Sequence, residues 1–145
     1  MVPRRDPRID RDVWLGDFAR RYGDVTFAIE GDPLEALKLG TYVGSCLGRG
    51  GACARSAAAV VLDVNKQVVY ARDARGAVLA RQLLAISDSD ELVCFRVYGQ
   101  AALAPLFRDF DRALADRLGI PISRGARSVS YVLSHWWLDD GDWDA

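Results

Sequence analysis

A chain of 145 residues, half of them apolar, is long enough to bury one hydrophobic core without disulfides or a structural metal. Its 19 basic and 20 acidic residues leave a net charge of −1, so composition indicates neither nucleic acid nor an anionic membrane as a partner. The 3 cysteines are too few for a secreted disulfide framework, and the longest apolar run, residues 57–62, is too short to span a bilayer.

The first nine residues predict a disordered lead-in or linker, because they are rich in proline, arginine and aspartate. They contain no apolar signal core, so the cytoplasm is the expected compartment. Residues 10–145 are expected to form a single domain.

The first half of this domain predicts a helix, a strand and a short helix. Apolar residues at helical spacing predict a helix over 10–22 that Gly23 ends: Val13, Trp14, Phe18 and Tyr22. Residues 25–29 alternate as a half-buried strand does. A proline directly after Asp32 predicts the start of a short helix that ends at Gly40.

A glycine-rich loop follows over residues 41–52, with glycines on both sides of Cys46. Such a loop can adopt dihedrals closed to other residues and can bring its backbone close to a ligand. The alanine-rich residues 53–64 predict a helix with small side chains that packs closely on a sheet.

The centre of the chain predicts an antiparallel meander over residues 67–98. Two apolar runs flank the turn Asp73 to Gly76, which is typical of a β-hairpin, and residues 92–98 add a third strand. Residues 101–118 predict an amphipathic helix that Gly119 caps, and short strands are expected at 120–122 and 128–133. We therefore expect an α+β domain, with an antiparallel sheet of three to five strands and helices mainly on one face.

Cys46 is one candidate for chemistry, as a nucleophile near a helix start. His135 is the one histidine and would be its base, and Asp139 or Asp140 would orient that base. The alternative is that Cys46 is a small apolar side chain without a chemical role. By count, the three cysteines and His135 would also complete a tetrahedral zinc set, but six residues separate Cys46 from Cys53, which argues against a metal.

A second candidate is the set of polar side chains on the predicted hairpin: Lys66, Arg72, Asp73, Arg75, Arg81 and Arg96. Across the hairpin Arg72 and Arg81 lie near each other, and two guanidinium groups on one face suit a carboxylate or phosphate. The alternative is a solvated sheet face with cross-strand ion pairs. The end of the chain, residues 136–144, mixes tryptophans with aspartates, which suits either docking on a basic partner or covering the sheet.

Residues 41–46 and 65–81, within a stretch of about residues 40–100, resemble domains near the C-terminal end of large bacterial proteins and are similar to the PcfJ-like group. That group also has a cysteine segment followed by a strand ending in arginine, a turn and another strand. Ser45 stands where the group often has a histidine. The resemblance implies that Cys46, Arg72 and Arg81 form one neighbourhood.

These observations favour a non-catalytic binding module of a bacterial multidomain system. It would recognise an acidic group through the glycine-rich loop, with Gly44 and Ser45, and through Lys66, Arg72, Asp73 and Arg81 of the hairpin: a small acidic ligand, a protein partner or a neighbouring domain. We expect neither a cofactor nor a metal. The alternative is a cysteine-dependent hydrolase or transferase that uses Cys46 with His135 and Asp139.

Overall fold

The computed structural model describes residues 9–51, 54, 57–58, 61, 65–87 and 89–123. Its helices and strands follow in the order α1 (Arg11–Trp14), β1 (Ala19–Tyr22), β2 (Val25–Ile29), α2 (Pro33–Ala36), β3 (Lys66–Arg72), β4 (Val78–Ile86), β5 (Leu92–Cys94), β6 (Tyr98–Gly99), the 3₁₀ helix η1 (Ala101–Leu103) and α4 (Ala104–Leu118). The predicted lead-in and the predicted strand over 128–133 lie outside the described residues, as does most of the predicted helix over 53–64.

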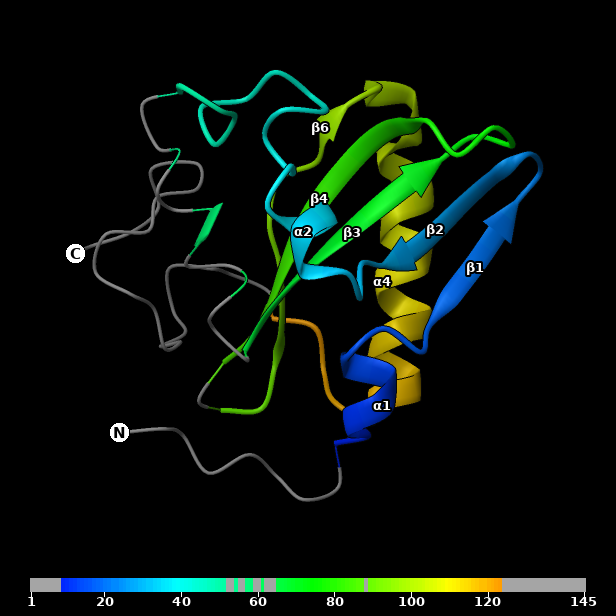
Figure 1. Ribbon diagram of the computed structural model, residues 1–145. Coiled ribbons are helices and arrows are strands. Elements are labelled where there is room, and N and C mark those ends of the chain that lie inside the picture. Colours follow the sequence, from blue (N-terminus) through cyan, green and yellow to red (C-terminus); the bar gives the residue numbers. More distant parts are fainter. Residues whose placement is uncertain are drawn as a thin grey trace.

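The strands form one antiparallel sheet in the order β1-β2-β3-β4-β5, and β6 pairs with β4 beside β5. From β1 to β5, strands adjacent in the sheet are also consecutive in the chain, as in the predicted meander. With helices beside this sheet the domain is α+β, which confirms the predicted class (Figure 1).

The hairpin of β3 and β4 is the best-defined part of the prediction. Its turn is closed by Asp73, whose Oδ1 accepts hydrogen bonds from the backbone N–H groups of Arg75 and Ala77, both at 2.9 Å. Gly76 takes the left-handed backbone conformation, at φ 84°, that this turn requires. The predicted strand over 92–98 is split into β5 and β6, and the predicted strand over 120–122 is a single parallel bridge from Leu92 to Ile122.

The predicted helix over residues 10–22 is wrong. The helix α1 ends at Trp14, and Gly16 follows at φ 126°, a conformation that an α-helix excludes. Tyr22 and Val25 pair across a two-residue turn, with Gly23 at φ 61°, so β1 and β2 are a hairpin. A spacing of four residues, as between Phe18 and Tyr22, puts two side chains on one side of a helix and also on one side of a strand.

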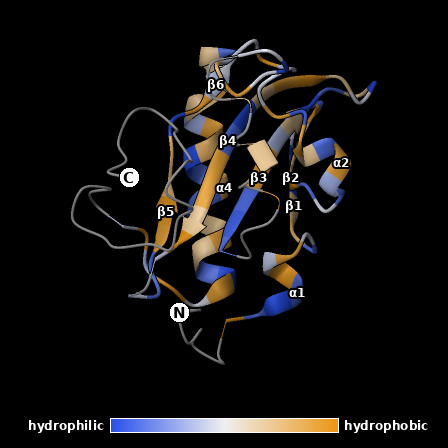
Figure 2. Cartoon of the chain, turned by 60° about the vertical axis from the view of Figure 1, so that its left-hand side comes forward, coloured by the Kyte–Doolittle hydropathy of each residue, from blue (hydrophilic) through white to orange (hydrophobic). Residues whose placement is uncertain are grey.

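Two hydrophobic clusters cover the two faces of the sheet. On the helix face, α1 and α4 pack against strand residues, and Phe27 of β2 meets the ring of Phe107 edge-on with centroids 4.8 Å apart. Hydrophobic and hydrophilic residues alternate along α4 in Figure 2, and its buried apolar residues include Phe107, Phe110 and Leu114.

The opposite face, here called the loop face, is covered by Ala36 of α2 and by Leu39 and Leu47, which flank Gly40 and Gly44. Its sheet residues are Val68, Tyr70, Leu83, Ala85, Val93 and Phe95. The longest helix thus lies on one face, as predicted, and the glycine-rich loop lies on the other.

Candidate functional site

The cations of the β3–β4 hairpin lie on the loop face. Arg81 pairs with Tyr70, and Lys66 pairs with Ala85, and both partners belong to the loop-face cluster. Because directly opposite residues of an antiparallel pair share a face, Arg81 and Lys66 both lie on the loop face of the sheet. Each is almost fully buried, with 0% of Arg81 and 2% of Lys66 exposed.

Arg81 joins the hairpin to the glycine-rich loop. Its Nη2 donates a hydrogen bond of 3.3 Å to Oγ of Ser45, which lies half-buried in the loop. Its guanidinium carbon also lies 4.2 Å from the centre of the Tyr98 ring. Burial of a charged group needs such partners, so Arg81 fixes the position of the loop over the sheet.

Arg96 approaches the same aromatic ring. Its guanidinium carbon lies 5.4 Å from the ring centre of Tyr98, within the distance at which a cation is attracted to an aromatic face. Unlike Arg81, Arg96 is exposed. Tyr98 therefore has a buried and an exposed guanidinium beside it.

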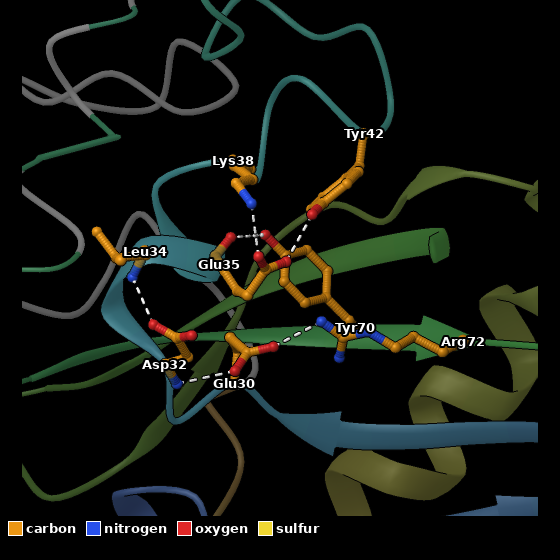
Figure 3. A network of polar contacts seen from close by, with 8 residues as sticks. All are labelled: Glu30, Asp32, Leu34, Glu35, Lys38, Tyr42, Tyr70 and Arg72. Carbon is orange, nitrogen blue, oxygen red and sulfur yellow. Dashed lines mark hydrogen bonds and ion pairs between the residues drawn. The ribbon is translucent and has the colours of Figure 1, made fainter. Parts of the chain in front are cut away.

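Arg72 is already engaged by an acidic residue of its own protein. Its Nη2 lies 2.6 Å from Oε2 of Glu30, and its guanidinium carbon lies 4.6 Å above the ring of Tyr70 (Figure 3). The predicted pair of Arg72 and Arg81 is thus divided, since each guanidinium has its own partners. Asp73, also predicted as a ligand-binding residue, accepts the turn hydrogen bonds described above.

A polar network fastens α2 to the sheet and to the start of the glycine-rich loop (Figure 3). The Glu35 carboxylate accepts hydrogen bonds from Nζ of Lys38 at 2.6 Å and from the Tyr42 hydroxyl. The Tyr70 hydroxyl donates to the backbone carbonyl of Glu35 at 2.7 Å, and burial raises the pKa of Tyr70.

These contacts stabilise the charged forms of Glu35 and Lys38 and the neutral hydroxyl of Tyr42. Hydrogen bonds from Lys38 and Tyr42 lower the pKa of Glu35, and the hydrogen bond to Glu35 raises the pKa values of Lys38 and Tyr42. All three shifts move the pKa values further from neutral pH, and the hydrogen bonds fasten α2 and the start of the glycine-rich loop.

Close backbone packing holds the glycine-rich loop in place. A Cβ atom on Gly40 would lie 2.1 Å from the backbone nitrogen of Gly48, so only glycine fits there. The backbone N–H of Ser45 donates to the carbonyl of Gly40 at 2.9 Å. Gly44 is exposed at φ 65° with open space around it, so the tip beside Ser45 is accessible.

The two cysteines within the described residues lie on opposite faces of the sheet. Cys46 is exposed in the glycine-rich loop, whereas Cys94 packs against the helix-face cluster. Burial and the nearby carboxyl of Asp111 raise the pKa of the Cys94 thiol. His135, Asp139, Asp140 and Cys53 lie outside the described residues, as do residues 136–144.

Sequence reasoning placed Arg81, Ser45 and Gly44 in one neighbourhood and missed the aromatic partner. The sequence pattern predicts Tyr98 only as the end of a strand. An aromatic residue opposite an arginine on a neighbouring strand is itself a signal for stacking. Glu30 had no sequence signal, because it follows β2 and meets Arg72 only through the pairing of β2 with β3.

Comparisons with known proteins gave no match, whether to family models, to curated proteins or to solved structures. Among the described residues, no helix is long and apolar enough to cross a membrane, and no group of three or more histidine, cysteine, aspartate or glutamate side chains could hold a metal ion.

Proposed function

We propose that the protein is a non-catalytic recognition module that binds an acidic group where the glycine-rich loop meets the arginine-bearing hairpin. The hydrogen bond between Arg81 and Ser45, beside the exposed Arg96, is the observation that carries this proposal. The resemblance to C-terminal domains of large bacterial proteins favours a partner protein or a neighbouring domain as the bearer of the acidic group.

Ser45 is suited to contact an anion. Its Oγ accepts the hydrogen bond from Arg81, and a hydroxyl that accepts one bond keeps its own O–H as a donor. The hydroxyl is half-buried beside the exposed Gly44, so a ligand oxygen can approach it from the loop side. Ser45 therefore supplies a donor held in place by a charged neighbour.

Arg96 supplies an exposed guanidinium to the proposed site, and Arg81 lies beneath it. A guanidinium presents a planar fork of N–H donors that matches both oxygens of a carboxylate or two oxygens of a phosphate. Arg96 is exposed and stands beside Tyr98, which limits where its side chain lies. Arg81, buried beneath, holds the Ser45 hydroxyl in place through its hydrogen bond.

Arg72 is assigned a supporting role. Its ion pair with Glu30 neutralises its charge, and this pair fastens β3 to the segment that enters α2. We expect Arg72 to shape the site without contacting the ligand.

The test is a binding titration with a hexaglutamate peptide and with inorganic phosphate, each at low ionic strength. For the variants Arg96→Gln and Ser45→Ala we expect the affinity for the bound probe to fall about tenfold or more, because each removes a charge-assisted hydrogen bond. Arg21→Gln is the matched control, since Arg21 is an exposed arginine of β1 with 69% of its side chain accessible. Wild-type affinity in Arg96→Gln, or an equal loss in Arg21→Gln, contradicts the proposal.

A cysteine-dependent enzyme is the second candidate, and the exposure of Cys46 favours it. In this function the Cys46 thiolate is the nucleophile, with His135 as its base and Asp139 orienting that base. For this second function we expect Cys46 to be alkylated rapidly below pH 7, and the rate of alkylation to fall in the variant His135→Ala. Labelling that is indifferent to His135 contradicts this second function and leaves the recognition module intact.

A further inference from the structure

A buried acidic residue stands on the helix face, away from the proposed site. Asp111 of α4 is 3% exposed, and Gln82 of β4, which faces it, is 4% exposed. The Gln82 Nε2 donates to Oδ2 of Asp111 at 3.2 Å and to the backbone carbonyl of Phe95 at 3.0 Å. These bonds make the pair the polar connection between the long helix and the centre of the sheet.

Each of the two side chains has one oxygen atom that accepts no hydrogen bond from the described residues. Within the described part of the chain, Oδ1 of Asp111 and Oε1 of Gln82 are both buried and accept no hydrogen bond. A buried acceptor without a donor is costly to the folded state. A carboxylic acid carries one O–H donor that an ionised carboxylate lacks, and an acid and a primary amide can then exchange two hydrogen bonds.

We propose that Asp111 and Gln82 form an acid–amide latch between α4 and β4 that holds a proton under mildly acidic conditions and loosens when that proton leaves. The proposal rests on the burial of both side chains, the bond between them and their two oxygens without donors. It is independent of the proposed acidic-group site, which lies on the other face of the sheet.

The groups around the carboxyl support a neutral acid. Burial raises the pKa of Asp111 to about 6, opposed in part by hydrogen bonds from Gln82 and from the Cys94 thiol and by the charge of Arg112. Among the described residues, these are the groups that act on it: Gln82 from β4, Cys94 from β5 and Arg112 from α4 itself.

The sign of the pH dependence follows from this shift. The pKa of an aspartate in an unfolded chain is about 4. Between about pH 4 and pH 6, Asp111 is therefore ionised in the unfolded chain while it stays protonated in the folded chain. Folding stability therefore falls as the pH rises through this range and stays lowered above it. An asparagine keeps a donor at every pH, so Asp111→Asn escapes the loss.

The test measures the unfolding equilibrium in urea for the wild type, for Asp111→Asn and for Asp109→Asn at pH 4, 6 and 7.5. We expect the ratio of the folding constant of Asp111→Asn to that of the wild type to rise about 50-fold from pH 4 to pH 7.5. Asp109 is the matched control, because it is an aspartate of α4 with half of its side chain exposed, and its ratio should change little. A pH-independent ratio for Asp111→Asn overturns the latch.

Two measurements keep the proposal testable if Asp111→Asn does not fold. Carbon NMR of the wild-type Asp111 carboxyl should show a midpoint near 6, and a midpoint near 4 overturns the proposal. Hydrogen exchange of the α4 amides, corrected for the intrinsic rate, should accelerate between pH 5 and pH 7 in the wild type. Protection of α4 that does not change over this range contradicts the loosening.

Discussion

The groups that contact each arginine determine what that arginine can bind. The sequence predicts Arg72 and Arg81 near each other on the hairpin, and the structure adds a hydrogen bond from Arg81 to Ser45 of the glycine-rich loop. The sequence does not reveal which acidic or aromatic group meets each cation, because Glu30 comes from a point 42 residues before Arg72. Contacts of that separation depend on strand pairing, which alternation alone does not specify.

The two thiols of the described residues provide a residue-scale prediction. We expect iodoacetamide to modify Cys46 at least about tenfold faster than Cys94 at pH 8, since the attacking species is the thiolate and burial raises the pKa of the Cys94 thiol. Mass spectrometry of digested protein after timed labelling measures both rates. Equal rates would contradict the exposure of Cys46 and the burial of Cys94.

At the scale of elements, the predictions succeeded where turn chemistry and periodicity agree. Asp73 and Gly76 define the β3–β4 hairpin, and Gly119, at φ 69°, ends α4 as predicted. The N-terminal helix failed because the spacing of Phe18 and Tyr22 fits two periodicities. The dipeptide Gly23-Asp24 between two apolar positions is the hairpin signal that would have corrected it.

The glycine-rich loop makes close backbone approaches at Gly40 and Gly51. The variant Gly40→Ala should destabilise the protein by about 1 to 3 kcal/mol, because its Cβ meets the backbone of Leu47 and Gly48 and not a movable side chain. Urea unfolding measures this loss. The same variant should weaken binding of the acidic probe, since displacement of the loop separates Ser45 from Arg81.

Gly31 provides the control for this substitution. Its Cβ would have only the carbonyl oxygen of Leu15 nearby, at 3.6 Å, which is ordinary contact. Gly31→Ala should therefore change stability by less than about 1 kcal/mol. A similar loss in both variants would show that the Gly40 contact does not hold the loop.

At the scale of the whole molecule, the buried acid–amide pair and the cations of the hairpin lie on opposite faces of one sheet. Among the described residues, the helix face is mainly apolar and carries the buried Asp111–Gln82 pair, whereas the loop face carries Lys66, Arg72 and Arg81. The class of the fold follows from composition and turns, so it was predictable. The site was predictable only in part, because the position of the loop is set by the Gly40 contact and the Arg81 hydrogen bond rather than by local propensity.

The central claim is that the glycine-rich loop and the arginine-bearing strands form one recognition surface. An NMR titration of the wild-type protein with hexaglutamate and with phosphate, following the backbone amides and the arginine Nε–H groups, tests it most directly. We predict that the chemical shift changes concentrate on Gly44, Ser45 and Arg96 and saturate together with one dissociation constant. Shifts confined to exposed arginines of β1 and α4, or the absence of any saturable shift in the loop, would contradict it.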